Sequence, residues 1–480
     1  MYKPIGAGQT GGRSRRYRRI GAVVGLALLW LLLAASASAR PNFVLMLTDD
    51  QRWDAVGVVQ REFGAAGRLP WLATATPNLD RIAREGFRFR NAFAVSSLCS
   101  PSRAAILTGR YNHLNGVANN HTPFPVANVT YASLLSAAGY RTGYFGKWHM
   151  GSQRERPGFA EYASFIGQGS YTNARFLVNG TSVPTAGWVD DVSTDYALDF
   201  IRRNAARSFA LVLGFKSPHG PWTPPTRLNG LFADAVPVAP ANATSYPPWD
   251  STRVPAASPA DDIRRYSRTL VGVDQNVGRV LALLDALGLA RNTVVVFASD
   301  NGFFLDEHGM GTPQDGTGNK RAAYQESVRV PLLVRYPALA RRNRTIDAIT
   351  LNVDLAPTIL QLAGLARPAT MQGKSFLGIM RGTFQRNRTR FLYEYFYETG
   401  WLVPTQVALQ QGPYKLIRYR ANPAWTELFA LDQDPLEMRN LAPLPEAAAL
   451  LASMNTSLDA ELTRFGYVVP TYADPEPGVD

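Results

Sequence analysis

Cysteine is almost absent from this sequence. The 480 residues include a single cysteine, Cys99, so no disulfide can form within the chain. A chain of this length without disulfides must draw its stability from a large hydrophobic core. A lone thiol is a liability in an oxidising compartment unless a reaction needs it. Cys99 is therefore the residue whose presence most needs a chemical reason.

Histidine and clustered positive charge are also scarce. The chain has five histidines and a formal net charge of +13, but no tract of Lys and Arg follows Arg19. This spread of charge argues against a nucleic acid partner. Apolar residues at 46% and charged residues at 18% exclude a disordered or collagen-like chain and indicate an ordinary globular protein.

The first 39 residues have the order of a secretory signal peptide. Basic residues without acidic ones precede an apolar run over 20–35, and Ser-Ala-Ser-Ala ends at Ala39. We predict cleavage after Ala39 and entry into the secretory pathway, with a secreted, periplasmic or lysosomal destination. An uncleaved signal anchor is the alternative, because residues 20–39 just reach the length that spans a bilayer.

Seven Asn-x-Ser/Thr sequons agree with export and predict a glycoprotein if the source organism glycosylates. They are at Asn120, Asn128, Asn179, Asn242, Asn343, Asn387 and Asn455.

Three apolar runs, each followed by polar residues, predict buried parallel strands with both faces covered. They are Asn42–Thr48 before Asp49 and Asp50, 209–215 before a segment that includes His219, and Thr293–Ser299 before Asp300 and Asn301. The carboxyl ends of such strands share one edge of an α/β sheet, where ligands bind. We therefore expect these polar residues to form one site.

The character of the sequence changes near residue 367. Before it, segment 263–287 has the apolar spacing of a long helix. After it, short strands are predicted over 405–410 and 414–419, followed by a helix over 444–465. We predict a catalytic domain over 40–366 and a smaller C-terminal α+β domain with a short antiparallel sheet over 367–480.

The run from Cys99 to Arg110 brings a reactive side chain, an arginine and a helix start together. It reads Cys-Ser-Pro-Ser-Arg-Ala-Ala-Ile-Leu-Thr-Gly-Arg. Ser100 is expected to cap a helix whose first position is Pro101. Arg103 then lies about one turn after Cys99, beside a helix N-terminus that favours an anion. Without further context, a buried structural cysteine would be the simpler explanation.

This run resembles the signature of the type I, formylglycine-dependent sulfatases. Five further segments resemble blocks of that family in the same order: 48–51, 146–149, 217–221, 299–302, and Lys320 ahead of 324–327. The resemblance covers most of the chain after Arg40. It implies an alkaline-phosphatase-like three-layer sandwich with a large, mostly parallel sheet. It also implies hydrolysis of sulfate esters, after a formylglycine-generating enzyme has converted Cys99 to an aldehyde.

The resemblance implies one bound Ca²⁺. Its ligands would be the oxygens of Asp49, Asp50, Asp300 and Asn301, together with residue 99. Hard oxygen donors of this kind suit Ca²⁺ or Mg²⁺, and no imidazole or thiolate cluster argues for zinc.

The family mechanism also implies roles for the catalytic residues. One hydroxyl of hydrated residue 99, eased by Asp300, would attack sulfur. His219, with Lys320 nearby, would protonate the leaving alcohol. His149 would then deprotonate the second hydroxyl and expel sulfate, while Arg103 and Lys147 would hold the diol. A serine could accept sulfate but would have no second hydroxyl with which to release it.

The substrate is expected to be a sulfated carbohydrate or an aryl sulfate. Segments 167–171 and 176–180 resemble those of sulfatases that act on sulfated sugars, including N-acetylglucosamine-6-sulfatases. Tyr171, Trp188 and Trp222 could stack on sugar rings or simply anchor the core.

Among the other histidines, His308 is expected to line the cleft, and His113 and His121 to be structural. Two alternatives to a sulfatase stay open. One is a phosphonate or phosphate monoester hydrolase on the same fold, and the other is an unmodified, non-catalytic carbohydrate-binding homologue.

Overall fold

Three strands that contain almost no polar residues form the centre of a large sheet. β1 (Asn42–Thr48) lies between β8 (Phe209–Gly214) and β9 (Thr293–Ser299) and pairs in parallel with both. All three strands are fully buried, as their apolar sequences predict. The three runs identified in the sequence are thus neighbours, and their carboxyl ends meet at one edge.

The computed structural model describes residues 1–4, 6, 40–151, 154–251, 257–311, 317–339 and 343–478. The predicted apolar run over 20–35 and the predicted cleavage site after Ala39 lie outside the described residues. Within the described ranges, no helix has the length and apolar character needed to cross a bilayer.

The large sheet has ten strands and is parallel at its centre. β10 runs antiparallel to its neighbours β9 and β2, and β5, β6 and β7 form an antiparallel edge. In spatial order the strands are β11 (Arg344–Ile346), β2 (Phe87–Phe89), β10 (Leu332–Arg335), β9, β1, β8, β4 (Arg141–Lys147), β5 (Glu161–Phe165), β6 (Arg175–Val178) and β7 (Thr181–Pro184).

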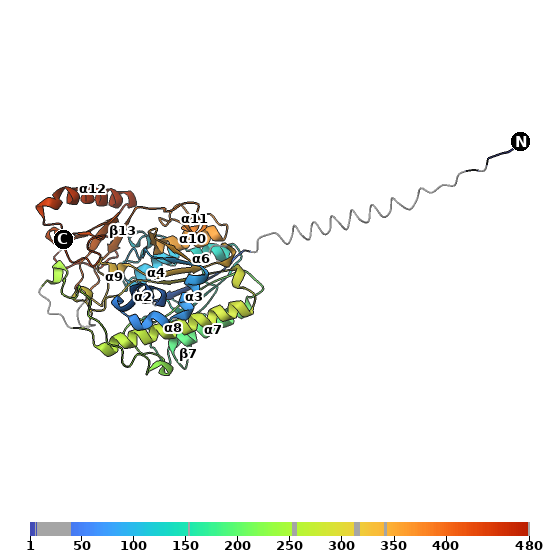
Figure 1. Cartoon of the computed structure of the whole chain (residues 1–480), viewed down its shortest axis with the longest axis horizontal. Coiled ribbons are helices and arrows are strands. Elements are labelled where there is room, and N and C mark those ends of the chain that lie inside the picture. The colour runs from blue at the N-terminus through green and yellow to red at the C-terminus, as the bar shows by residue number, and fades with distance from the viewer. Residues whose placement is uncertain are drawn as a thin grey trace. The chain divides into compact units, whose positions relative to one another are not determined.

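Helices cover both faces of this sheet, which gives the three layers (Figure 1). The helices of the described ranges are α2 (Gly57–Phe63), α3 (Pro77–Glu85), α4 (Cys99–Thr108), α5 (Asn112–Asn115), α6 (Tyr131–Ala137), α7 (Val189–Arg203), α8 (Ala260–Ala286), α9 (Gln325–Val328), α10 (Leu355–Leu362), α11 (Leu377–Arg381) and α12 (Ala448–Phe465).

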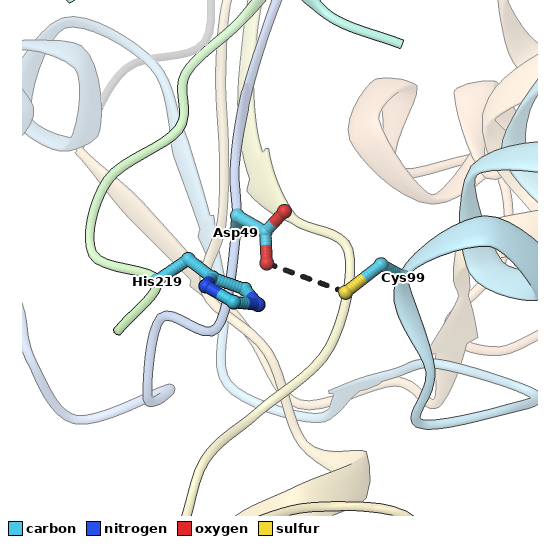
Figure 2. Close-up of side chains that lie close together, drawn as sticks. All are labelled: Asp49, Cys99 and His219. Carbon is cyan, nitrogen blue, oxygen red and sulfur yellow. Dashed lines mark hydrogen bonds between the residues drawn. The ribbon is translucent and has the colours of Figure 1, made fainter. Parts of the chain in front are cut away.

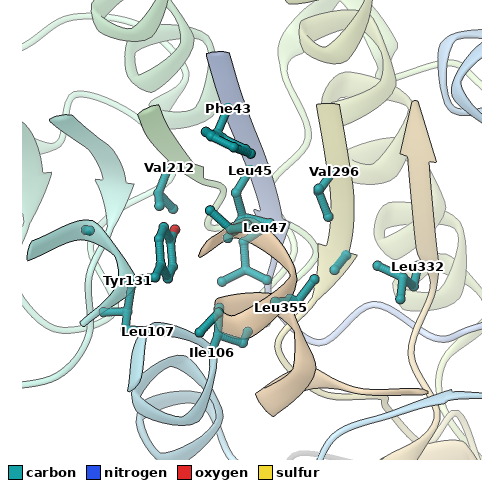
Figure 3. Close-up of a cluster of buried hydrophobic side chains, with 14 of the residues drawn as sticks. Phe43, Leu45, Leu47, Ile106, Leu107, Tyr131, Val212, Val296, Leu332 and Leu355 are labelled. Carbon is teal, nitrogen blue, oxygen red and sulfur yellow. The ribbon is translucent and has the colours of Figure 1, made fainter. Parts of the chain in front are cut away.

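Side chains of β1 alternate between two hydrophobic cores. Leu45 and Leu47 pack with residues of α4, α6 and α10, as Figure 3 shows for Ile106 and Leu355. Val44 and Met46 pack on the opposite face with residues of α3, α7 and α8. Since successive side chains of a strand point to opposite faces, an apolar strand is stable only when both faces are covered.

A second, antiparallel sheet lies in the C-terminal part of the chain. Its strands are β13 (Arg390–Tyr395), β14 (Gln406–Gln411), β15 (Tyr414–Tyr419) and β16 (Glu427–Ala430), and α12 packs on it. A two-stranded sheet joins β3 (Ala92–Phe93) to β12 (Thr350–Leu351). The core of the second sheet includes Ala105 of α4, so the helix that begins at Cys99 is packed between the two sheets.

Candidate active site

Acidic residues at the ends of β1 and β9 lie in contact with one another. The backbone N–H of Asp300 donates to Thr48 O at 3.1 Å, which continues the pairing of the two strands. The backbone N–H of Asp50 donates to Asp300 Oδ1 at 3.2 Å. One carboxylate oxygen from each of Asp49, Asp50 and Asp300 lies within 4.8 Å of the others. The expected convergence of strand ends is therefore present.

Cys99 lies beside this acidic cluster. It is completely buried, and its thiol donates to Asp49 Oδ1 at 3.4 Å (Figure 2). Lys320 Nζ lies 3.0 Å from Cys99 Sγ and 2.6 Å from Asp50 Oδ1. Burial, followed by the negative charge of Asp49, raises the pKa of the Cys99 thiol to about 12, so the thiol is protonated at neutral pH.

The helix that carries Cys99 begins earlier than the sequence predicts. α4 starts at Cys99 with Leu98 as its N-cap residue, and Ser100 does not cap it. The Ser100 hydroxyl instead donates to the carbonyl of His149. The backbone N–H of Ser100 donates to Asn120 Oδ1 at 3.1 Å, so a side chain distant in sequence satisfies this first-turn donor.

Arg103 and Lys147 place positive charge against the carboxylates of the acidic cluster. Arg103 Nε donates to Asp300 Oδ2 at 2.8 Å, and its Nη2 lies 3.2 Å from Asp49 Oδ2. Lys147 Nζ pairs with the same Asp49 oxygen, and both cations are buried. Gly146 allows β4 to approach β8 here, because its φ is +93° and a Cβ would lie 2.0 Å from Gly214 O.

Two histidines approach the cluster from loops that follow β4 and β8. His219 Nδ1 lies 2.6 Å from Gly220 O, so an Nδ1–H would donate there, and Nε2 is 3.7 Å from Asp50 Oδ2. Figure 2 shows His219 facing Asp49 and Cys99. Burial and then the charge of Lys147 hold the pKa of both His149 and His219 well below the usual value. Both imidazoles are therefore neutral at pH 7 and able to accept a proton.

The acidic cluster has the donors that a hard divalent cation requires. Burial and repulsion from Asp49 raise the pKa of Asp300 to about 7. Burial alone would raise the pKa of Asp49, but the positive charges of Lys147, Arg103 and Lys320 lower it well below the usual range. Asn301 Oδ1 is buried and accepts no hydrogen bond within the described part of the chain. Three crowded carboxylates and an orphaned amide oxygen fit a Ca²⁺ or Mg²⁺ ion.

A cavity of about 590 Å³ opens above these residues, and we call it the inner cavity. Asp50, His149, His219 and Lys320 are among the residues that line it. Its other lining residues are Asn120, His121, Gln168, Gly220, Pro221, Trp222, Thr223, Asp262, Arg265, Phe303, Gly318, Asn319, Arg321, Glu398 and Trp401.

The expectations for the remaining histidines are partly corrected. His308 does not line the inner cavity, because its ring is buried, stacks on Tyr324 at 4.0 Å and lies 3.6 Å from the Glu326 carboxylate. His121 does line the cavity, although a structural role was predicted for it. His113 is structural as expected, since it is buried in an ion pair with Glu394.

Of the three aromatic residues that could stack on a sugar, Trp222 lines the inner cavity, whereas Tyr171 and Trp188 do not. Tyr171 is buried, and its hydroxyl donates to His219 O at 2.6 Å.

Sequence reasoning missed Glu398, which comes from the loop after β13. One of its carboxylate oxygens accepts from Arg321 Nη2 at 2.7 Å, and the other accepts from the backbone N–H of Asn120 at 2.7 Å. Asn120 in turn holds the start of α4, and Arg321 follows Lys320. The buried Glu398 carboxylate is thus connected to Ser100 through Asn120, and to the segment that carries Lys320 through Arg321. Ser100 follows Cys99 in the sequence, and Lys320 contacts its thiol. No local pattern around Glu398 signals this contact.

These features define an ester hydrolase site, with a nucleophile position, a hard-cation donor set and two neutral imidazoles below a cavity. The chain belongs to the sulfatase family, because residues 41–365 match the family's model. Residues 314–464 match the model of the C-terminal region of N-sulphoglucosamine sulphohydrolase. The predicted family is thereby confirmed, and the chain is an enzyme that hydrolyses sulfate esters.

Several known proteins are similar to this chain in sequence and in fold. N-acetylglucosamine-6-O-sulfatase of Bacteroides thetaiotaomicron is 30% identical and covers 84% of this chain and 82% of its own length. A structure solved in complex with its substrate, D-glucosamine-2-N,6-O-disulfate, has a TM-score of 0.79 at 29% identity and covers 91% of this chain and 100% of its own. The phosphonate monoester hydrolase of Agrobacterium radiobacter shares the fold at 19% identity, with a TM-score of 0.72 over 89% of this chain and 96% of its own.

Proposed function

We propose that this enzyme hydrolyses the 6-O-sulfate ester of a glucosamine-type sugar such as N-acetylglucosamine 6-sulfate. The observation that carries the proposal is the contact of buried Cys99 with Asp49 and with Lys320, because Lys320 also lines the inner cavity. The substrate class is supported by the name of the Bacteroides relative and by the 6-O-sulfated glucosamine bound in the similar structure.

Residue 99 acts in this proposal as formylglycine, produced from Cys99 by a formylglycine-generating enzyme. The hydrated aldehyde carries two hydroxyls, one to attack sulfur and one whose deprotonation expels sulfate. The buried surroundings of Cys99 suit a side chain that has to be held in one orientation.

We propose one Ca²⁺ beside residue 99, held by Asp49, Asp50, Asp300 and Asn301. The crowded carboxylates and the unpartnered Asn301 Oδ1 support this assignment. When bound, the ion would supply a Lewis acid that offsets negative charge on the transferring sulfuryl group.

The positively charged side chains of the site fix the positions of the oxygen atoms around residue 99. Lys320 Nζ already contacts Cys99 Sγ, so it can donate to an oxygen at the same position. Arg103 and Lys147 lie behind the acidic cluster and fix its geometry. Because these side chains are buried, their charges act more strongly than they would in bulk water.

The two histidines divide the proton transfers. His219 lines the cavity, and its Nε2 is 3.7 Å from Asp50 Oδ2. Because this imidazole is neutral at rest, Nε2 first accepts the proton released by the attacking hydroxyl of residue 99 and then passes it to the leaving alcohol of the sugar. His149 lines the cavity beside the start of α4, and its Nδ1 is buried without a hydrogen-bond partner within the described residues. It can take the proton from the second hydroxyl of residue 99.

Two predictions from the sequence complete the proposal. Residues 40–366 form the catalytic domain and residues 367–480 a smaller domain that contributes Glu398 and Trp401 to the cavity wall. The protein is exported after cleavage at Ala39, so that Cys99 is oxidised in the secretory pathway.

A phosphonate monoester hydrolase shares this fold. The fold alone therefore does not distinguish hydrolysis of sulfate esters from hydrolysis of phosphonate esters. The non-catalytic alternative is disfavoured because Arg103, Lys147, His149 and Lys320 are all present and gathered around Cys99.

The test is expression with and without a formylglycine-generating enzyme, followed by assays on three substrates. We expect hydrolysis of N-acetylglucosamine 6-sulfate and 4-nitrophenyl sulfate only after co-expression, and little turnover of a phosphonate monoester. Faster cleavage of the phosphonate would overturn the proposal in favour of the alternative. Cleavage of the aryl sulfate but not of the sugar would overturn the assigned substrate alone.

A further inference from the structure

The loop that follows β8 carries His219 into the active site, and a side chain from α7 holds its first residues. We call residues 215–222 the His219 loop. The backbone N–H of Lys216 donates to Asp190 Oδ1 at 2.7 Å, and that of Ser217 donates to Asp190 Oδ2 at 3.1 Å. Asp190 is the second residue of α7 and is completely buried. One carboxylate therefore holds two successive backbone amides.

Asp190 takes the place of a neighbouring strand at the end of β8. The pairing of β4 with β8 ends at Gly146 and Gly214. Beyond this point Asp190 supplies the acceptors that buried backbone N–H groups require. On the opposite side the pairing with β1 continues, because the backbone N–H of Asp49 donates to Ser217 O at 3.1 Å. The His219 loop is thus joined directly to the segment that carries the acidic cluster.

A second side chain holds the loop at His219 itself. The backbone N–H of His219 donates to Lys216 O at 3.0 Å and closes a turn between these two residues. The Tyr171 hydroxyl donates to His219 O at 2.6 Å. Asp190 and Tyr171 therefore hold the two ends of the turn. The imidazole at its end faces Cys99 (Figure 2).

The Asp190 carboxylate is mostly ionised at neutral pH. Burial raises the pKa of Asp190 to about 6, although the hydrogen bonds from Ser217 and Lys216 oppose this rise. Amide bonds to a charged acceptor are stronger than bonds to a neutral one. Neither Asp190 nor Tyr171 lines the inner cavity, so any effect of these residues on the reaction passes through His219.

We propose that Asp190 and Tyr171 are positioning residues for proton transfer by His219. The inference rests on the proposed function, in which Nε2 of His219 accepts a proton from residue 99 and passes it to the leaving alcohol. The two residues fix the backbone at both ends of the turn and so keep Nε2 at 3.7 Å from Asp50 Oδ2. Displacement of a reacting group by about 1 Å can lower the rate of such a step about 10²-fold.

The test compares two aryl sulfates that differ in their need for a proton at the leaving oxygen. 4-Nitrophenol departs readily as an anion, whereas phenol is about as weak an acid as a tyrosine side chain and needs protonation. Asp190→Asn replaces one acceptor by an amide N–H and leaves a buried backbone N–H unpaired. We expect its kcat to fall about 30-fold with phenyl sulfate and about threefold with 4-nitrophenyl sulfate.

Tyr171→Phe removes a single hydroxyl and should show the same preference. We expect its kcat to fall about fivefold with phenyl sulfate and to stay nearly unchanged with 4-nitrophenyl sulfate. Because this change is small, it tests the inference even if Asp190→Asn does not fold. Asp199→Asn is the matched control, since Asp199 pairs with Arg203 on the exposed side of α7, and it should leave both rates unchanged.

A double variant separates positioning from a general loss of structure. In a His219→Gln background the proton carrier is already absent, so Asp190→Asn should not change the ratio of the two rates any further. An equal loss with both substrates in either folded single variant, or a further change of the ratio in that background, would overturn the inference while the proposed function stands. An inactive wild type with verified formylglycine would refute the proposed function, and the inference with it.

Discussion

Lys320 and Cys99 are 221 positions apart in the sequence, yet Lys320 Nζ lies 3.0 Å from Cys99 Sγ. The same ammonium group lies 2.6 Å from Asp50 Oδ1. Burial alone would lower the pKa of Lys320, but the charge of Asp50 raises it. Lys320 is therefore a permanent positive charge at the nucleophile.

Replacing this charge should lower activity strongly. For Lys320→Ala we expect kcat/KM for an aryl sulfate to fall by about 10²–10³-fold, the usual effect of losing one charge-stabilising donor. Steady-state kinetics on protein with verified formylglycine content measures this. The exposed Lys374 supplies the control variant, Lys374→Ala, which should retain activity. Activity within threefold of wild type in Lys320→Ala would contradict the assigned role.

Serine at position 99 should trap the first half of the reaction. In Cys99→Ser the hydroxyl attacks sulfur, the S–O bond to the alcohol breaks, and the sulfate ester that forms has no second hydroxyl to expel it. We expect one equivalent of product per protein and a mass increase of about 80, equal to SO₃, on intact-mass analysis. Cys99→Ala should show neither. Continuous turnover by Cys99→Ser would rule out this division of labour.

Calcium should stabilise the protein even where no substrate is present. Binding at 100 times the dissociation constant adds about 2.7 kcal/mol to the free energy of unfolding. We expect Ca²⁺ to raise the melting temperature of the wild type but not of Asp300→Asn, which loses one carboxylate of the cluster. Asp261→Asn, on the exposed side of α8, is the control and should respond as the wild type does. An equal Ca²⁺ shift in Asp300→Asn would place the ion elsewhere.

Glu398 should act on catalysis through the two groups that it positions. Glu398→Gln keeps the shape but leaves the buried charge of Arg321 without its partner, so we expect kcat to fall about tenfold and the melting temperature to fall as well. Glu446→Gln, at an exposed position, is the control. A change confined to stability, with kcat intact, would show that Glu398 only supports the fold.

The buried pair of His308 and Glu326 should make stability depend on pH. Burial alone would raise the pKa of Glu326, but the charge of His308, whose Nε2 is 3.6 Å from Glu326 Oε2, lowers it to about 2 from its usual 4.5. Burial alone would lower the pKa of His308, but Glu326 raises it above its usual 6.5. The carboxylate contribution is present above pH 4.5 and lost as pH falls toward 2, and the imidazolium contribution is present below pH 6.5 and lost at higher pH.

Removing that pair should therefore cost most near neutral to mildly acidic pH. We expect Glu326→Gln to lower the free energy of unfolding by about 3 kcal/mol between pH 4.5 and 6.5, and by less on either side. Urea denaturation of both proteins across this range measures the difference. A pH-independent difference would mean that the pair is not ionised.

The central sheet and most of the site could be predicted from the sequence because their signals are local. β1, β8 and β9 are short apolar runs followed by polar residues, and such runs fit only buried strands whose ends coincide. The start of α4 was misplaced because Leu98 acts as the N-cap residue without a side-chain bond, whereas Asn120 from another loop satisfies Ser100 N–H.

What the sequence could not reveal depends on contacts between distant segments. Glu398 reaches Asn120 and Arg321 only after the C-terminal sheet has packed near α4. His308 was expected to line the cleft because it follows Asp300 closely, yet its pairing with Glu326 and its stacking on Tyr324 hold it in the core. A residue's distance along the chain from a catalytic motif does not determine which way its side chain points.

The role of residue 99 is tested most directly by the mass of the tryptic peptide that spans residues 91–103, compared with the sulfatase activity of the same preparation. Conversion of Cys99 from thiol to aldehyde lowers this mass by about 18. If formylglycine at position 99 is the nucleophile, sulfatase activity rises in proportion to the converted fraction and is absent when Cys99 is unconverted. Full activity in protein whose Cys99 is entirely a thiol would contradict this role of residue 99.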